Sequence, residues 1–396
     1  MIKYILLFSF FLKVVTKSDV YFTRTISPEK IVELYKKLNI NLIGPIGLKI
    51  HSGEKNGPYY LRPSFLKDIY NYTNGTFIEC NVAYRGSRYS TELHKELLKF
   101  NGWSQYRSLI MDESEENDLV LKVNNHHIIP ENIVGQYLNN FNSCLVLSHF
   151  KGHGMGGFGG ALKQLSIGFA SRAGKTYIHT AGATKDYNKI WSKIAKQADF
   201  TAAMADSAST IVNYFKNKGG IAYINVLANI SKSCDCAGST APEPKIKDIG
   251  ILASIDPVAI DKACYDLITR ENSVGSREWI KQAEAKLGLN TLDKAIEHGL
   301  GELDYNLINI DNDNNNNNDI SLSETKTLPN ENSKNEKNNK KYDTPFKIIS
   351  FFASFIFIIF IIMSIMSIII FLVKKRKKGK LVANEELGQT SPEEKV

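Results

Sequence analysis

The chain has 396 residues, of which 43% are hydrophobic, a length that allows one large domain or two ordinary domains with a buried core. Its net charge is +8, but residues 374–378 (KKRKK) supply five positive charges in one block, so we expect no nucleic-acid partner. The five cysteines are too few for a disulfide scaffold.

The N-terminus resembles a targeting segment. It has a lysine-containing start (Met1-Ile2-Lys3), an apolar run from Tyr4 to Leu12, and then small polar residues. This order is typical of a secretory signal peptide, which we predict over residues 1–18. The alternative is a buried first strand.

Strands and helices alternate through residues 19–310, the predicted folded body. A helix is predicted to start at Ser27-Pro28-Glu29, because serine caps helix N-termini and proline is favoured in the first turn. The other predicted helices cover residues 62–72, 91–100, 186–197, 200–215, 257–269, 276–287 and 291–299, and the predicted strands cover 42–50, 76–80, 144–148, 221–227 and 248–254. This alternation predicts an α/β fold with a mainly parallel sheet flanked by helices, which we expect to form two lobes.

A glycine-rich segment directly follows the third of these strands. Six of the nine residues from Gly152 to Gly160 are glycine. Ordering so many glycines costs more backbone conformational entropy than ordering an ordinary core segment. A strand, a glycine loop and a helix in succession can point backbone N–H groups at an anion or a cofactor. The alternative is a structural turn. We predict cofactor contacts at Gly156, Gly157, Gly159 and Gly160.

Two further polar loops follow predicted strands, where sites collect in α/β folds. The first, residues 81–88, contains Arg85 and Arg88, which suit an anionic ligand. The second contains Cys234-Asp235-Cys236, whose two cysteines can bind a metal as thiolates. A disulfide to Cys80, or a simple turn, is the alternative for that loop.

The C-terminal part contains the predicted membrane anchor. Residues 348–373 are 26 positions without a charge, enough for a transmembrane helix. The basic block after them places the tail, residues 374–396, in the cytoplasm by the positive-inside rule. Residues 311–343, which include five consecutive asparagines, are predicted to form a disordered stalk.

These end segments predict a single-pass membrane protein of the secretory pathway or cell surface, with its N-terminal body outside the cytoplasm. Glycosylation sequons at Asn71, Asn74 and Asn229 agree with that location. The membrane is thus one expected partner, through the C-terminal helix, and a small anionic molecule is the other.

Three stretches together resemble the domain-of-unknown-function 362 family. They are residues 81–88, residues 149–163, and Cys234-Asp235-Cys236 with residues 248–261 (DIGILASIDPVAID). The likeness covers nearly the whole body. Some members of that family have an added ferredoxin-like module with repeated Cys-x-x-Cys. This chain has no Cys-x-x-Cys, so we expect no ferredoxin-type iron–sulfur cluster.

The core of the glycine-rich segment is also similar to that of the nickel-pincer lactate racemases. Lys163 lies ten positions after His153, with Gly157-Phe158-Gly159-Gly160 between them, and His179 lies sixteen positions after Lys163. The resemblance implies that Lys163 attaches the cofactor covalently and takes part in catalysis. It also implies that His153 is a catalytic acid/base and that His179 ligates nickel.

Further candidates come from the first polar loop and from the helix after it. In the racemases the first lobe supplies an Asp-x-x-Arg and another catalytic histidine. The resemblance implies these roles for Arg85, Arg88 and His94, although Asn81 stands where an acid is expected. His149 is a further candidate metal ligand, because a neutral imidazole binds nickel and other transition metals well.

These features lead to two functional hypotheses. The first is a membrane-anchored protein whose exterior domain binds nickel, another transition metal or an organic cofactor. It would act on a small carboxylate by proton or hydride transfer, as racemases, epimerases or oxidoreductases do. The second is a non-catalytic surface binding or adhesion protein that retains an enzyme fold. The spacing of His153, Lys163 and His179 favours the first, whereas the stalk, the anchor and an oxidising location favour the second.

Overall fold

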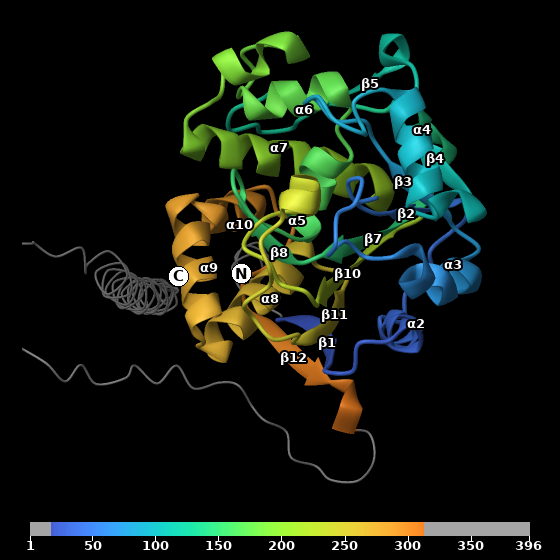
Figure 1. Ribbon diagram of the computed structural model, residues 1–396, viewed down its shortest axis with the longest axis vertical. Helices are drawn as coiled ribbons and strands as arrows, with labels where there is room; N and C mark the ends of the chain where they lie inside the picture. Colours follow the sequence, from blue (N-terminus) through green and yellow to red (C-terminus); the bar gives the residue numbers. More distant parts are fainter. Residues whose placement is uncertain (1–16, 313–396) are drawn as a thin grey trace, which may run out of the picture. The chain divides into compact units, whose positions relative to one another are not determined.

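A sheet of eight strands runs through residues 17–312, the part of the chain that the structure, a computed structural model, describes (Figure 1). The strands lie in the order β12-β1-β11-β10-β7-β2-β3-β4. Their bounds are β1 Ser18–Thr23, β2 Ile46–Lys49, β3 Thr76–Glu79, β4 Ser108–Ile110, β7 Ser143–His149, β10 Ile221–Leu227, β11 Gly250–Ser254 and β12 Tyr305–Asn309. Neighbouring strands are parallel except at β11, which runs antiparallel to β1 and β10. The predicted mainly parallel α/β sheet is confirmed.

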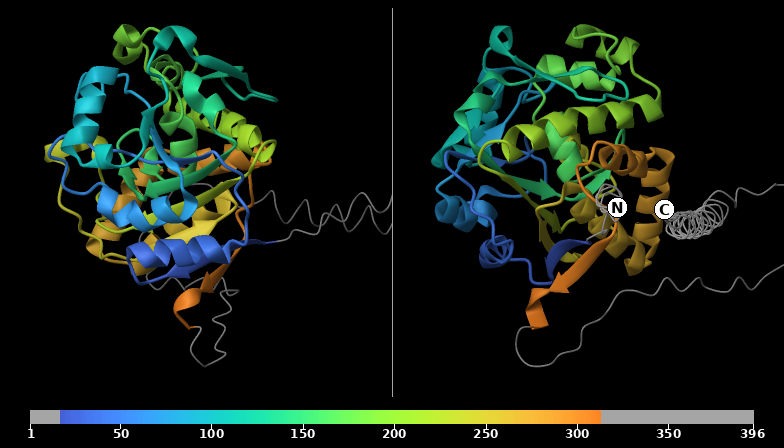
Figure 2. Two further views of the ribbon diagram at one scale, coloured as in Figure 1. Left: turned by 90° about the vertical axis from the view of Figure 1, so that its right-hand side faces the viewer. Right: turned by 180° about the vertical axis from the view of Figure 1, so that it is seen from behind.

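Helices cover both faces of this sheet (Figure 2). Alternate residues of β7 show the two faces, since Cys144 and Val146 belong to one apolar cluster and Leu145 and Leu147 to the other. The helices of the second cluster are α2 (Pro28–Lys37), α3 (Lys67–Thr73) and α4 (Thr91–Phe100). Those of the first include α7 (Gln197–Lys216), α8 (Pro257–Glu271), α9 (Val274–Ala285) and α10 (Gly288–Glu297). The described residues fall within one compact unit, so the two expected lobes are not separate.

Most predicted elements lie close to their predicted ends. α4 and β10 match the predicted helix 91–100 and strand 221–227, and Ser27 caps α2 by accepting the Lys30 N–H. Residues 187–192 form a 3-10 helix instead of the start of a longer helix. The helix α6 (Arg172–His179) was not predicted. It contains Gly174, where a Cβ would lie 1.9 Å from the Ile133 carbonyl oxygen, so close packing explains a residue that usually disfavours helix.

The predicted targeting and anchoring segments lie almost entirely outside the described residues. Of the predicted signal peptide only Lys17 and Ser18 are described, and Ser18 begins β1. The predicted stalk, apart from its first two residues, and the segments 348–373 and 374–396 also lie outside. Within residues 17–312, no helix is both long and apolar enough to cross a bilayer.

The order in which the chain builds the sheet creates a crevice at one edge. From β2 the chain adds β3 and β4 on one side, and it then places β7 and later β10 on the other side. The loops that leave the carboxyl ends of β2 and β7 therefore diverge. In open α/β sheets, ligands bind at such a reversal of strand order.

Candidate functional site

A cavity of about 370 Å³ lies at this edge of the sheet, a volume that suits a small organic molecule. Its wall comes from the loops after β2, β3, β7 and β10, and from the segment between α5 (Ala161–Lys163) and the end of α6. The predicted site residues on this wall are Arg88, His153, Lys163, His179, Cys234 and Cys236. The predicted site residues that do not line it are Arg85, His94, His149, Gly156, Gly157, Gly159 and Gly160.

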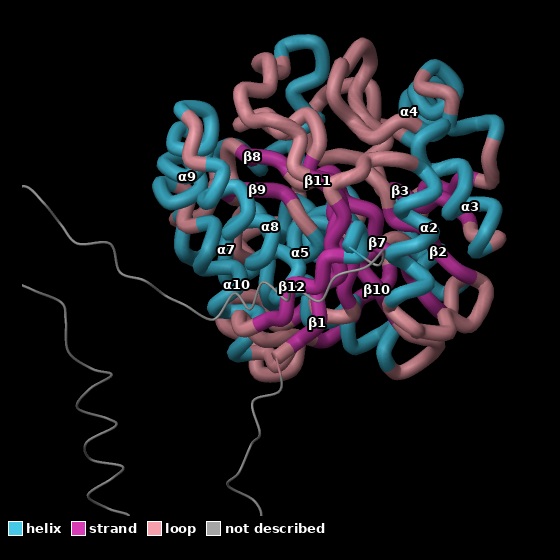
Figure 3. Tube along the Cα trace, turned by 90° about the horizontal axis from the view of Figure 1, so that it is seen from below, coloured by secondary structure: helices cyan, strands magenta, loops and turns pink. Residues whose placement is uncertain are grey.

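The glycine-rich segment forms a hairpin of two short strands, β8 (Lys151–His153) and β9 (Gly157–Gly159) (Figure 3). A Cβ added to Gly157 would lie 2.7 Å from the Gly288 Cα, and one added to Gly160 would lie 2.3 Å from Asp261 Oδ1. Added to Gly156 or Gly159, it would contact protein atoms at 3.4 Å and 3.6 Å. The position of a side chain at each of these four glycines thus faces the protein's own chain, and cofactor contact there stays a prediction.

Asp261 of α8 fixes the start of α5. Its carboxylate accepts the N–H groups of Ala161 at 2.7 Å and Leu162 at 3.0 Å, and the side-chain amide of Asn225 at 2.7 Å. Burial raises the pKa of Asp261 to about 6. These bonds satisfy free N–H groups at the helix N-terminus, so they hold the helix that positions Lys163.

Lys163 faces the cavity with its amine. Within the described part of the chain, that amine has no hydrogen-bond or ion-pair partner. Burial, followed by the nearby positive charges of Lys151 and Arg88, lowers the pKa of Lys163 from 10.5 to about 7. Near neutral pH a large fraction of this amine is therefore unprotonated, the form that acts as a base or a nucleophile.

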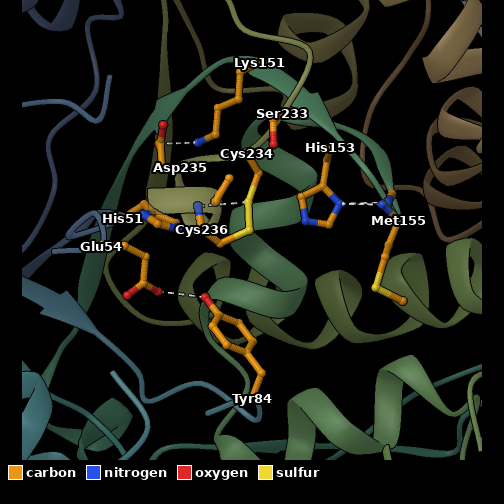
Figure 4. Close-up of a disulfide and its surroundings, with 12 residues drawn as sticks. His51, Glu54, Tyr84, Lys151, His153, Met155, Ser233, Cys234, Asp235 and Cys236 are labelled. Carbon is orange, nitrogen blue, oxygen red and sulfur yellow. Dashed lines mark hydrogen bonds and ion pairs between the residues drawn. A yellow bond between two sulfur atoms is a disulfide. The ribbon is translucent and has the colours of Figure 1, made fainter. Parts of the chain in front are cut away.

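His153 lies beside the Cys234–Cys236 disulfide (Figure 4). Its Nδ1 accepts the backbone N–H groups of Gly156 at 2.8 Å and Met155 at 3.2 Å. Burial, with Lys163 and His179 nearby, lowers the pKa of His153 well below 6.5. A neutral ring whose Nδ1 accepts must carry its proton on Nε2. His153 is thus arranged to donate a hydrogen bond, and it lacks the free lone pair that the expected general base would need.

His179 has the opposite arrangement. Its Nδ1 lies 2.7 Å from the Lys175 carbonyl oxygen and must donate to it, which leaves the Nε2 lone pair free. Burial lowers the pKa of His179 to about 4, so the ring is neutral at physiological pH. This geometry fits the predicted role as a metal ligand.

His149 does not share that geometry. Its Nδ1 lies 3.0 Å from Asp235, and its Nε2 lies 2.7 Å from the Ala228 carbonyl oxygen. Each ring nitrogen faces an oxygen acceptor, so neither offers a free lone pair to a metal. His149 thus supports Asp235 and does not line the cavity, so this geometry does not favour the ligand role, which stays a prediction.

The strand side of the cavity is a paired ion network. Glu79 accepts from Lys49 at 2.8 Å and lies 3.5 Å from Arg88, which also pairs with Glu54 at 2.9 Å. Burial raises the pKa of Glu79, but Lys49 and Arg88 outweigh that effect and hold it well below its usual value. Arg85 is exposed and away from the cavity, so only Arg88 of the two predicted arginines is in a position to meet a ligand.

His94 lies behind this network and is fully buried. Its Nδ1 bonds to Asn81 Oδ1 and its Nε2 to the Ser52 hydroxyl, both at 3.1 Å. Burial lowers the pKa of His94 to about 3. Because both nitrogens are satisfied within the protein, this geometry favours a structural role for His94, and its catalytic role stays a prediction.

Cys234 and Cys236 are joined in a disulfide on the cavity wall. Of the alternatives for this loop, a bridge to Cys80 is excluded, because Cys80 is free and buried. The two sulfurs and a ring nitrogen of His153 lie within 4.8 Å of one another. The sulfurs become thiolate ligands only after the disulfide is reduced.

Asp235, between the two cysteines, connects this wall to the glycine hairpin through ion pairs. Its carboxylate pairs with Lys151 at 2.8 Å as well as with His149. Burial raises the pKa of Asp235, but His149 and Lys151 outweigh it and hold the pKa well below its usual value.

Some cavity residues were not predicted from the sequence. They are His51, Glu79, Tyr84 and Lys175. Glu79 ends β3 and His51 follows β2, so their positions at the ends of parallel strands were the available signal. Lys175 reaches the cavity from α6, whose fold depends on tertiary packing, and no local pattern marks it.

Known proteins resemble this chain in part. The family described as a domain of unknown function (DUF362) matches residues 46–266, more than half of the chain. None of the curated proteins matches the sequence.

Among solved structures, the chain is similar to the lactate racemase apoprotein from Thermoanaerobacterium thermosaccharolyticum, with 12% identity, a TM-score of 0.37 and coverage of 62% of this chain and 57% of that one. It is also similar to a protein from Thermotoga maritima, with 13% identity, a TM-score of 0.36 and coverage of 68% and 59%. The aligned part spans less than two thirds of either of those proteins.

Proposed function

This chain belongs to the DUF362 family, whose name assigns no activity, and we propose its function from the cavity itself. The cavity binds a small anion that bears a carboxylate, either a substrate or an organic cofactor. Lys163 and His153 then assist proton transfer at the carbon next to that carboxylate. The observation that carries this proposal is the free, partly neutral amine of Lys163.

The charge around the cavity supports an anionic ligand. Arg88, Lys163 and Lys175 all line the wall, and Lys151 lies close enough to lower the pKa of Lys163. The one carboxylate on the wall, Glu79, is already paired with Lys49 and Arg88. Because Arg88 is also paired with Glu54, and Lys151 with Asp235, an entering carboxylate would meet the positive charge of Lys175 and of the protonated fraction of Lys163, and it would reduce their mutual repulsion.

The proposed chemistry divides the work between two side chains. The neutral Lys163 amine takes a proton from the carbon next to the carboxylate, and its pKa near 7 suits both removal and return of that proton. The His153 Nε2–H donates a hydrogen bond to the oxygen on which negative charge develops. His179, with its free Nε2, would hold a transition metal such as nickel if the cofactor contains one, and the metal would supply electrophilic assistance.

A binding protein without catalysis is the second candidate. It is favoured by His94, which is buried behind the ion network and leaves the cavity without the second acid/base histidine that the racemase resemblance implies. In this alternative the cavity retains the ligand but not the reaction.

We further propose that the protein is anchored by residues 348–373 and that its body faces an oxidising compartment. The Cys234–Cys236 disulfide supports that location, because disulfides persist mainly outside the cytosol. A protease-protection assay on sealed membranes tests it, since an exterior body would be digested from outside while the tail would be protected.

The first test of the ligand proposal uses the full chain purified from its native source. Elemental mass spectrometry measures bound metal, and peptide mass spectrometry measures any added mass on Lys163. Calorimetry with small 2-hydroxy and 2-oxo carboxylates then measures affinity. We expect Lys163→Met to weaken binding at least about tenfold, because it removes a charge close to the ligand.

Lys189→Met is the matched control, because Lys189 is exposed and does not line the cavity. Unchanged affinity in Lys163→Met would remove the anion proposal. Binding without proton exchange at the neighbouring carbon in deuterated water would favour the non-catalytic alternative.

A further inference from the structure

A second cluster of metal-ligating side chains lies outside the cavity. His127 comes from the loop between β5 (Leu119–Lys122) and β6 (Glu131–Val134), Asp206 from the middle of α7, and His298 from the end of α10. None of the three lines the cavity. α7 and α10 pack together, so three segments far apart in the sequence meet here (Figure 1).

The ligand atoms of this cluster are close enough for one metal ion. One nitrogen from each histidine and one carboxylate oxygen lie within 4.8 Å of one another, and His298 Nε2 is 2.8 Å from Asp206 Oδ1. Bonds of about 2.0–2.1 Å in a tetrahedral zinc site separate the ligand atoms by roughly 3.4 Å. Binding thus requires ligand shifts of only about 1 Å, together with a change of tautomer in His298, because the proton that Nε2 donates to Asp206 must move to Nδ1 before Nε2 can bind the ion.

One ring nitrogen of His127 lacks a hydrogen-bond partner among the described residues. Its Nε2 is buried and has no hydrogen bond within residues 17–312. Glu297 Oε2 lies 3.6 Å away, too far for a hydrogen bond, and the other oxygen of that half-exposed carboxylate pairs with Lys294 at 2.7 Å. A buried polar atom without a partner is uncommon and costs stability, and a cation would satisfy it.

Asp206 is held in place by other groups. Its side chain is fully buried, and its oxygens accept the N–H groups of His127, Ile128 and Ile129 at 2.9, 2.7 and 2.9 Å. The same bonds position the loop that presents His127. Orientation of a carboxylate ligand by surrounding hydrogen bonds is typical of metal sites.

We infer that His127, Asp206 and His298 form a site for a zinc-type divalent ion, with Glu297 or water as the fourth ligand. Two imidazoles and one or two carboxylates suit Zn²⁺, whereas Ca²⁺ and Mg²⁺ require mostly oxygen ligands. The ion would link the β5–β6 loop to α7 and α10, and it would stabilise the fold because it binds the native state but not the unfolded chain.

The test uses the full chain with its disulfide intact, stripped of metal and then given ZnCl₂. We expect about one tightly bound zinc per chain and a rise in the unfolding temperature. Cobalt in place of zinc should give the visible absorption of a tetrahedral nitrogen–oxygen site. His127→Ala should weaken binding by at least roughly 10–100-fold, while leaving the hydrogen bond between Asp206 and His298 intact.

Two controls separate this site from others. His126→Ala changes the exposed neighbour of His127 and should bind zinc as the unaltered chain does. The double variant Cys234→Ser/Cys236→Ser should also retain zinc, because those cysteines belong to the cavity. Zinc binding that survives His127→Ala, or that disappears only in the cysteine variant, would overturn the inference. Neither result bears on carboxylate binding in the cavity.

Discussion

The two sides of the cavity differ in whether their charged side chains have ion-pair partners. On the strand side, Glu79, Lys49, Arg88 and Glu54 are all paired with one another within the protein. On the helix side, Lys163 has no such partner among the described residues. Paired buried charges hold the wall in shape, whereas an unpaired charge remains available to a ligand. The contrast teaches that burial and charge alone do not identify a functional residue.

The largest expected effect comes from breaking the strand side. Glu79→Gln removes the partner of Lys49 and Arg88 and leaves two buried positive charges with reduced compensation. We expect a loss of about 3–5 kcal/mol in the free energy of unfolding, measured by urea denaturation. The exposed carboxylate of Glu92 offers the control, Glu92→Gln, for which a change within about 0.5 kcal/mol is expected. Equal effects of the two variants would contradict the network.

The next effect tests how the helix side is positioned. Gly160→Ala places a Cβ 2.3 Å from Asp261 Oδ1, the group that holds the start of α5. We expect a loss of about 2–3 kcal/mol in chemical denaturation, together with weaker ligand binding through displacement of Lys163. Gly154→Ala is the matched control for stability alone, since a Cβ there meets nothing within 4 Å but Gly154 lines the cavity. A stable, fully binding Gly160→Ala protein would show that the hairpin tolerates a side chain.

A third prediction concerns His94, which lies behind the ion network on the strand side of the cavity. His94→Gln disturbs the bonds to Ser52 and Asn81, and we expect a loss of about 1–2 kcal/mol in stability. Because His94 does not line the cavity, the variant that remains folded should bind carboxylates with unchanged affinity. If calorimetry instead showed affinity falling at full stability, the predicted catalytic role would regain support.

The last prediction concerns how the stability of the chain depends on pH through Lys163. The pKa of Lys163 is about 7 in the folded chain and near 10.4 for a solvated lysine, so the folded chain binds fewer protons between these values. The cost of its buried charge is present below pH 7 and disappears as the pH rises toward 10. Lys163→Met should therefore be stabilising at both pH 6 and pH 9, by the larger amount at pH 6, as measured by urea denaturation at each pH.

Reductive methylation of the unaltered chain, followed across pH, measures the same pKa. Lys163 should reach half of its maximal labelling rate near pH 7, whereas ordinary solvated lysines require a higher pH. Labelling of Lys163 that rises only near pH 10 would place the amine in solvent.

The outline of the fold could be predicted because its signals are local. Ser27 caps a helix as expected, and continuous apolar runs marked β7 and β10, the central buried strands. The edge strand β12 was missed, because only alternate residues are partly buried and several are polar. α6 was missed because its glycine is explained only by contact with β6.

The candidate site could be predicted only in part, for a related reason. The sequence brought attention to His153, Lys163, His179, Arg88 and the two cysteines, and the fold brings all of them to one cavity. The sequence alone could not distinguish the cavity histidines, His153 and His179, from His94 and His149, because all four carry the same imidazole side chain. Hydrogen bonds to Asn81, Ser52, Asp235 and Ala228, all distant in sequence, favour structural roles for His94 and His149.

Local sequence signals were enough to identify the family, the alternation of strands and helices, and the spacing between His153 and Lys163. These depend on backbone propensity, apolar periodicity and motif order, which act over a few residues. Only the tertiary structure decided which nitrogen of each histidine is free, which lysine lacks a partner and how glycines are used. Those properties depend on burial and on partners brought together by the sheet, and the free energy of a charge or a lone pair is set by those surroundings.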